Sequence, residues 1–245
     1  MVSEIHDNRQ LLGAAAANAT AAKINQLLNE QPVVNVIFAA APSQNEFLAA
    51  LSGSPVDWKR VNAFHMDEYI GLDENAPQTF AYYLNTHLFE KVSFKAVYYI
   101  HGNAPDPVIE CHRYAALLKQ FPADVVCMGI GENNHIAFND PPVADFYDPE
   151  AVKVVSLDRD CRQQQVNDGC FPDLENVPER AITLTIPALL NGRYIFAMVP
   201  GERKAKAVYH TMHSPVTERY PSTIFKRHPA VQLFLDRDSS KMIRP

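Results

Sequence analysis

Short apolar runs alternate with longer amphipathic stretches along most of the chain. The runs predict strands at Val33–Ala40, Arg60–Phe64, Val97–Ile100, Asp124–Ile130, Lys153–Leu157, Ala181–Ile186, Tyr194–Val199 and Val231–Leu235. Helices are expected at Leu11–Leu28, Gln44–Leu51, Gln78–Phe89, Pro107–Gln120 and Glu202–Thr211. Because strands and helices alternate, the pattern is typical of an α/β protein.

The run Val33–Phe38 is rich in β-branched residues and has little polar alternation. Such a run suits a strand that is buried on both faces, as in a parallel sheet covered by helices. No linker, repeat or low-complexity tract divides the chain. We therefore expect a single domain over residues 1–245, a three-layer α/β/α fold with a mostly parallel, Rossmann-like sheet.

Composition narrows the class of protein. The 245 residues are 47% hydrophobic and 20% charged, with a formal net charge of −6. An acidic chain lacks the basic face that nucleic acid requires. No segment approaches roughly 18 consecutive apolar residues, so we expect no membrane span. The nine glycines form neither GxGxxG nor GxxxxGK[ST], which argues against a glycine-rich nucleotide loop.

The first residues lack the apolar run of a signal peptide, so we expect a cytoplasmic protein. Four cysteines without CxxC spacing are then best interpreted as reduced thiols. A disulfide between Cys161 and Cys170 is the less favoured alternative.

In open parallel sheets, ligands bind at the carboxyl ends of the strands, so the loops after the apolar runs matter most. The first such loop contains Ser43 and Glu46 in S-x-x-E spacing, which predicts a capping box. A capped helix start also attracts anions. These residues by themselves favour the cap over an anion site.

The second loop places Asp67 beside Glu68, directly after a buried strand. Neighbouring side chains diverge, so one carboxylate can face a cleft while the other supports it. A partly desolvated carboxylate has a raised pKa and can shuttle protons. Two solvated acids that cap the following turn are an equally weighted alternative.

The third loop, Gly129–Pro142, carries His135 among several polar residues, with closely spaced Gly129 and Gly131. The glycines indicate a tight turn, where backbone approaches a ligand or another segment. An imidazole held by a carboxylate is a natural acid/base catalyst. This setting favours function over a structural histidine.

The fourth loop opens a predicted helix with Arg203, Lys204 and Lys206, where cations oppose the helix dipole. That cost is explained if one of them reaches a phosphate, although a solvated helix face is the commoner meaning of a charge run. A metal held by His65, Asp67 and His135 is conceivable, but no spacing demands it, and we expect no metal.

Two long motifs occur together. Phe64–Leu72 (FHMDEYIGL) resembles the F-N-M-D-E-Y-x-G-L motif of the glucosamine-6-phosphate deaminase/isomerase family, which is related to the 6-phosphogluconolactonases. Gly129–Pro141 resembles that family's G-x-G-x-[DN]-G-H-I-x-F-N-E-P segment. Shorter matches at Gly102–Asp106 and Gly201–Ala205 follow in the same order, so the resemblance covers roughly Leu11–Leu235. Lactonases usually have D-E-R where this chain has D-E-Y, which favours the deaminase branch.

The resemblance implies an enzyme without organic cofactor that converts a hexosamine 6-phosphate into a ketose 6-phosphate and ammonia. Asp67 matches the base that moves a proton between two sugar carbons. His135 matches the ring-opening histidine, with Asp140 in place of the family's orienting glutamate. Asn133 occupies a position that holds aspartate or asparagine in the family.

For the phosphate, the resemblance implies Lys204 and the loop containing Ala41, Ser43 and Gln44. That loop is commonly T-G-[GS]-T-P in the family and differs here. The family's phosphate arginine aligns near Asp168, so Arg162 or Arg203 is expected to compensate. Asn134 replaces a glycine, and asparagine tolerates the left-handed backbone better than most residues.

With these departures from the family pattern, the residues expected to transfer protons are still present, but the identity of the sugar substrate stays open. Galactosamine 6-phosphate is an alternative to the glucosamine epimer. A lactone hydrolase of the 6-phosphogluconolactonase type and a sugar-phosphate sensor with weakened catalysis are the alternative functions. Members of the family are often oligomers, and the sequence leaves a homo-oligomer open.

Overall fold

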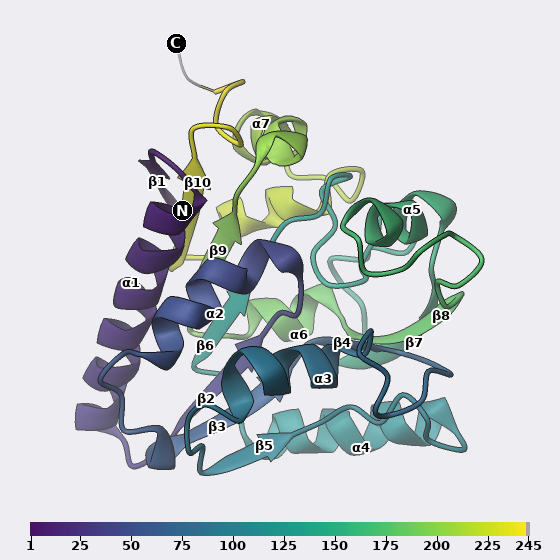
Figure 1. Ribbon diagram of the computed structural model, residues 1–245, viewed down its shortest axis with the longest axis horizontal. Helices are drawn as coiled ribbons and strands as arrows, with labels where there is room; N and C mark the ends of the chain where they lie inside the picture. Colours follow the sequence, from purple (N-terminus) through teal and green to yellow (C-terminus); the bar gives the residue numbers. More distant parts are fainter. Residues whose placement is uncertain (244–245) are drawn as a thin grey trace.

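The computed structural model describes residues 1–243, and its centre is a seven-stranded sheet in which all neighbouring strands are parallel (Figure 1). In spatial order the strands are β1 (Val2–His6), β10 (Val231–Asp236), β9 (Tyr194–Val199), β6 (Val125–Met128), β2 (Val34–Phe38), β3 (Val61–His65) and β5 (Ala96–Tyr98). Six of them confirm predicted strands within a few residues. β1, at one edge, was not expected.

Helices cover both faces of this sheet and make three layers. On one face lie α1 (Arg9–Glu30), α2 (Asn45–Ser52) and α3 (Phe80–Leu84), which continues into a π-helical turn, Asn85–Phe89. On the other lie α4 (Pro107–Gln120), α6 (Ile186–Leu190) and α7 (Ala205–His213). The predicted fold class is confirmed.

Side chains of the central strands alternate in direction and so contribute to two hydrophobic cores, one on each face of the sheet. On β6, Val125 and Cys127 join the core under α1 and α2, whereas Val126 and Met128 join the core under α4 and α6. Successive side chains on a strand point to opposite faces, so a strand buried on both faces must be apolar throughout. This is why the apolar runs located these strands.

A second, three-stranded antiparallel sheet was not predicted. It consists of β4 (Asp67–Tyr69), β8 (Arg180–Leu184) and β7 (Val152–Ser156), in that order. Apolar runs had located β7 and β8, but nothing in them showed that they leave the main sheet. Residues Asp67–Tyr69, expected in a loop, form the edge strand, so the loop prediction was wrong there.

Two short helices complete the description. α5 (Arg159–Asn167) lies on the side of the molecule away from α1 (Figure 1). Its low apolar content hid it from the pattern analysis. α6 was also missed, because the predicted strand Ala181–Ile186 ran into it. There Thr185 caps the helix, and a proline in the first turn ends the extended run.

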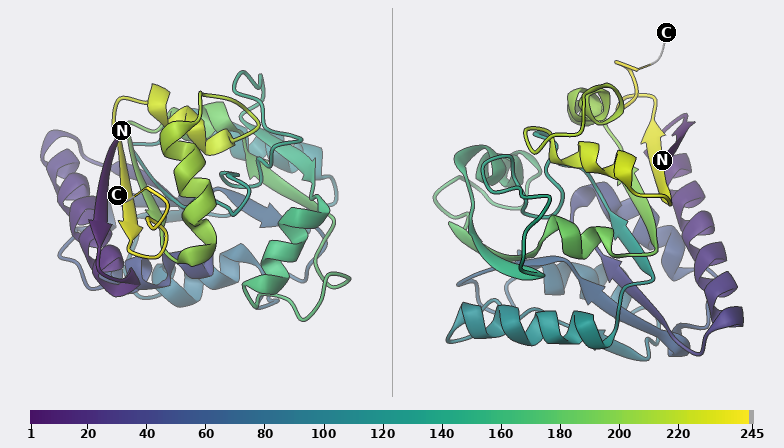
Figure 2. Two further views of the ribbon diagram at one scale, coloured as in Figure 1. Left: turned by 90° about the horizontal axis from the view of Figure 1, so that it is seen from above. Right: turned by 180° about the vertical axis from the view of Figure 1, so that it is seen from behind.

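Figure 2 shows β1 and β10 side by side at the edge of the main sheet next to α1. The four cysteines, all within the described residues, are unpaired, so the predicted thiols are confirmed and the Cys161–Cys170 disulfide is not formed. Over residues 1–243, no helix has both the length and the apolar character that crossing a bilayer requires.

Candidate active site

A cavity lies at the carboxyl ends of four adjacent strands, β9, β6, β2 and β3. Residues that follow each strand line it, among them Ala40 after β2, Met66 after β3, Gly129 after β6 and Lys204 after β9. Parallel strands gather their following loops at one edge of the sheet. The cavity is therefore where the sequence analysis expected a ligand.

Asp67, His135 and Lys204 all line this cavity, although they are far apart in the chain. They are 7%, 9% and 8% exposed, so each is largely withdrawn from water. Ala41, Ser43 and Gln44 line it as well. The structure thus brings together a carboxylate, an imidazole and an ammonium group in one small space.

Asp67 and Glu68 diverge from adjacent positions of β4. Burial, and then the nearby charge of Glu68, raise the pKa of Asp67 well above its ordinary value. The Glu68 carboxylate turns away and accepts hydrogen bonds from the backbone N–H groups of Tyr69 (2.9 Å), Phe80 (3.1 Å) and Ala81 (2.9 Å). One acid faces the cavity and the other ties β4 to the start of α3.

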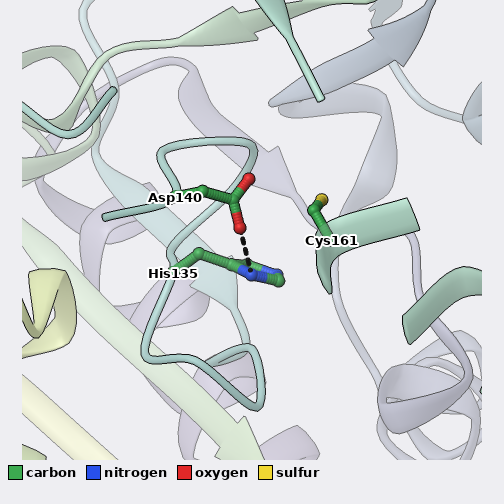
Figure 3. A group of neighbouring side chains, drawn as sticks. All are labelled: His135, Asp140 and Cys161. Atoms are coloured by element: carbon green, nitrogen blue, oxygen red, sulfur yellow. Dashed lines mark ion pairs between the residues drawn. The ribbon is translucent and has the colours of Figure 1, made fainter. Parts of the chain in front are cut away.

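His135 is held from one side of its ring. Its Nδ1 lies 2.7 Å from Asn133 Oδ1 and 3.0 Å from Asp140 Oδ1. Asn133 Nδ2 in turn donates to Asp140 Oδ1 at 2.9 Å. Figure 3 shows Asp140 directed at the His135 ring, with Cys161 of α5 facing them. The contacts orient the imidazole through Nδ1 and leave Nε2 for a ligand.

The neighbours of the Asp140 carboxylate determine its charge. Burial acts to raise the pKa of Asp140, but the neighbouring His135 and the hydrogen bonds from His135 and Asn133 outweigh it, so the pKa lies below the ordinary value. Asp140 therefore stays ionised near neutral pH and favours a proton on His135 Nδ1. The shorter side chain in place of glutamate still reaches the ring.

Two positions constrain the backbone of the loop that carries His135. Asn134 has φ of 72°, in the left-handed region, as its place opposite a family glycine predicted. Its amide donates to the carbonyl of Ala207 at 2.7 Å and to Ser222 Oγ at 2.8 Å, which anchors the loop to α7. At Gly131 a Cβ would lie 2.1 Å from the His135 ring, so only glycine fits beneath the imidazole.

The loop after β2 forms differently from the prediction. Pro42–Gln44 make a 3₁₀ turn, α2 begins at Asn45, and no side chain caps either. Glu46 instead pairs with Arg9 at 2.6 Å. The predicted capping box is wrong, because the extra turn moves the start of the α-helix one residue along the chain, from Gln44 to Asn45.

Ser43 and Gln44 contribute polar groups to the cavity. Gln44 Nε2 donates to Ser43 Oγ at 3.0 Å and to the carbonyl of Met198 at 3.4 Å. Lys204 sits in a 3₁₀ turn before α7. Burial lowers its pKa, against the opposing charges of Asp168 and Glu132. Within residues 1–243, its ammonium group has neither a hydrogen bond nor an ion pair, which leaves it available to an anion.

The expected substitutes for the phosphate arginine lie elsewhere. Arg162 donates to the carbonyls of Leu174 (2.7 Å) and Val177 (3.2 Å), outside the cavity. The structure therefore does not bring Arg162 to the cavity with the other residues expected to bind phosphate. Arg203 does not line the cavity either, but its NH1 is 3.5 Å from Oδ1 of Asp168, which does, and 3.5 Å from Glu132 Oε1.

The wall opposite the strands comes from α5 and the residue that caps it, which the sequence analysis did not assign. Gln164, Gln165 and Asp168 all line the cavity. Gln164 Oε1 also accepts a hydrogen bond from the backbone N–H of Glu132 at 3.0 Å. In the sequence, the polar run Gln163–Gln165 lies close to the segment in which the phosphate arginine was expected. This run was the feature that could have indicated this wall of the cavity.

His65, Asp67 and His135, which the sequence analysis considered as possible metal ligands, do not all lie together. His65 lies outside the cavity, where its Nε2 accepts a hydrogen bond from the backbone N–H of Ile100 at 2.8 Å. Burial lowers the His65 pKa to about 4, so it is neutral at physiological pH. Donor atoms of His135, Asp140 and Cys161 do lie within 4.8 Å of one another, and these three could approach a cation together.

Comparison with known proteins agrees with the motifs. The family model described as glucosamine-6-phosphate isomerases/6-phosphogluconolactonase matches residues 7–234. The chain belongs to this family. Among its relatives, the glucosamine-6-phosphate deaminase of Listeria monocytogenes (strain HCC23) is 36% identical over 211 residues, which are 86% of this chain and 88% of that protein.

Solved structures of the family have the same fold. A monomeric glucosamine-6-phosphate deaminase superposes with a TM-score of 0.89 and 26% identity, over 99% of this chain and 100% of that one. The 6-phosphogluconolactonase of Trypanosoma brucei superposes with a TM-score of 0.79 over 99% of this chain and 98% of that one. Its 15% identity shows a common fold and nothing about activity. The family assignment made from the two motifs is confirmed.

Proposed function

We propose that this protein is a hexosamine-6-phosphate deaminase, which isomerises an amino-sugar phosphate and releases ammonia to give a ketose 6-phosphate. The observation that carries the proposal is the shared cavity of Asp67, His135 and Lys204. The names of the relatives with 36% and 26% identity support it. The chemistry needs a base, a ring-opening acid/base group and an anchor for an anion, and the cavity offers one of each.

His135 opens the sugar ring. Its Nδ1 proton is held by Asp140 and Asn133, so Nε2 carries the lone pair that faces the ligand. Nε2 takes the proton from the hydroxyl on the first carbon and returns it to the ring oxygen. The bond between the first carbon and the ring oxygen breaks, and an aldehyde forms. Asp140 stabilises the imidazolium while it carries the proton.

Asp67 then moves the proton between carbons. As a carboxylate it removes the hydrogen from the second carbon, and it returns that proton to the first carbon. The second carbon is left as an iminium and the oxygen of the first carbon as an alkoxide. The hydroxide part of a water molecule adds to the second carbon, and the proton of that water passes to the alkoxide. The new hydroxyl group then gives its proton to the nitrogen, a carbonyl forms, and ammonia leaves with the electrons of the carbon–nitrogen bond. Its raised pKa makes Asp67 a stronger base than a solvated aspartate once it is ionised.

Lys204 and Ser43 are assigned to the phosphate. A buried ammonium with no competing ion pair in residues 1–243 attracts a dianion or monoanion strongly, because the surrounding protein screens the charge less than water does. Phe138 and Phe80 pack against each other with ring centroids 5.6 Å apart and help to keep water out of the cavity.

The decisive experiment is an ammonia-release assay on the purified protein with glucosamine 6-phosphate, galactosamine 6-phosphate and the same sugars without phosphate. We expect ammonia and a ketose phosphate from one hexosamine 6-phosphate. Release from none of them would reject the deaminase. Parallel assays of 6-phosphogluconolactone hydrolysis and of hexosamine-phosphate binding separate the lactonase and the non-catalytic sensor.

A further inference from the structure

A carboxylate lies at the end of the cavity that the proposed function assigns to the phosphate. Asp168 follows α5 and lines the cavity on the wall opposite the strands, close enough to Lys204 for its charge to raise the pKa of that ammonium group. Its side chain is 20% exposed, and its polar contacts are long: Gln164 Nε2 lies 3.5 Å from Oδ2 and Arg203 NH1 lies 3.5 Å from Oδ1. The carboxylate therefore keeps capacity to accept a hydrogen bond from a ligand.

A second acceptor is present nearby. Gln44 is 1% exposed and lines the cavity, and its Oε1 accepts no hydrogen bond from any residue in 1–243. Its Nε2 is already directed at the Met198 carbonyl and Ser43, which fixes the orientation of the amide. A buried acceptor without a donor costs free energy until a ligand supplies one.

Hydrogen-bond donors and hydrogen-bond acceptors therefore both surround the position proposed for the phosphate. Lys204 and the Ser43 hydroxyl can donate, whereas Asp168 and Gln44 Oε1 can only accept. A fully ionised phosphate ester has no proton to give, so it would meet the Asp168 charge without a hydrogen bond. A phosphate that keeps one proton can donate to this carboxylate and satisfy it.

We propose that Asp168 makes this end of the cavity selective for a phosphate group that carries a proton. The inference rests on the proposed function and adds a specificity-determining residue to it. Phosphate monoesters lose their second proton with a pKa of about 6. The binding-competent monoanion therefore falls about tenfold per pH unit above that value, and affinity falls with it.

Other charged and titratable groups besides Asp168 lie near the phosphate end. They are Lys204 and Arg203 after β9, Glu132 and His135 after β6, Asp67 on β4, and the Cys170 thiol, whose pKa burial and Asp168 raise. Loss of the Asp168 charge also lowers the pKa of Lys204 and of the Cys170 thiol, so the comparison of two anions at one pH is the arm that does not depend on their titration.

The test is calorimetric binding of a hexitol 6-phosphate, which has neither an aldehyde nor an amino group to react. Between pH 7 and pH 8 we expect the Kd of the parent to rise about tenfold and that of Asp168→Asn to rise less than about twofold. Asp160→Asn, an exposed carboxylate on the same helix, should keep the slope of the parent. Asp168→Ser provides a second variant, and a thermal melt confirms that each is folded.

Inorganic phosphate and sulfate supply an independent arm, because the phosphate dianion keeps a proton and sulfate has none. The parent should bind sulfate at least about tenfold more weakly than phosphate, and Asp168→Asn should bind both within about threefold. Equal pH slopes in parent and variant, or equal affinity of the parent for the two anions, would overturn the inference. Ammonia release is measured separately, so a deaminase with equal slopes refutes only the role of Asp168.

Discussion

The two ends of the cavity are built differently. At the end assigned to proton transfer, His135 is fixed by Asn133 and Asp140 at 2.7 and 3.0 Å. At the end assigned to the phosphate, Lys204 has no ion pair within residues 1–243, and Asp168 has only contacts of 3.5 Å. The comparison shows that the groups assigned to proton transfer are already oriented without a ligand, whereas those assigned to the phosphate keep free hydrogen-bonding capacity.

The largest expected effect comes from removing the base. Asp67→Asn keeps the shape of the side chain but takes away the proton acceptor, so kcat should fall about 10³-fold. Binding of a hexitol 6-phosphate, measured by calorimetry, should stay within about threefold of the parent. Asp73→Asn, in the exposed segment after β4, is the matched control and should leave kcat unchanged. Parent-like turnover by Asp67→Asn would remove the assigned base.

The fixed imidazole is tested by His135→Gln, for which we expect kcat on the cyclic sugar to fall about 10²-fold. An open-chain analogue needs no ring opening, so it should lose much less. The measurement is the ratio of the two rates in variant and parent. Equal losses on both substrates would show that His135 does not act in ring opening.

The phosphate end should respond in KM more than in kcat. Lys204→Met removes the buried cation while keeping much of its apolar length, so we expect KM to rise about 30-fold with kcat within about threefold. Arg162→Met, whose guanidinium holds backbone carbonyls outside the cavity, should change KM by less than about twofold. A reversed pattern would return the phosphate contact to Arg162.

The last prediction concerns stability and Glu68, the acid that supports the site, and not the reaction itself. Burial raises the Glu68 pKa to about 7 against three backbone hydrogen bonds. A folded-state pKa above the unfolded value means that stability is lost as pH rises from about 4.5 through about 7. Urea unfolding at pH 5 and pH 8 should show a loss larger in the parent than in Glu68→Gln, by up to about 3 kcal/mol. Equal losses would place the titration elsewhere.

Much of the fold was predictable because a central parallel strand must be apolar on both faces. β9 was predicted with its observed bounds, and α4 was as well, with a proline in its first turn and Asp106 as its cap. The family motifs were equally informative, because Gly131 and Asn134 are required by the geometry of the loop around His135.

Other parts depended on partners that the local sequence does not contain. β4 is a three-residue strand of polar and aromatic residues, and it is defined by pairing with β8, more than a hundred residues away. Ser43 and Glu46 have capping-box spacing, yet the ion pair with Arg9 and the 3₁₀ turn prevail. α5 is so polar that only its packing against the cavity marks it as a wall.

The sequence alone determined the family and the parallel core, and it named the carboxylate, the imidazole and the lysine that we propose for the site, because these follow from local patterns and motif order. Tertiary structure decided which of two adjacent acids faces the cavity, that Arg162 lies outside it, and that Asp168 stands on its wall. Where these side chains point depends on pairing and packing between segments that are distant in the sequence. The residues at a loop or an edge strand do not by themselves encode the direction of their side chains.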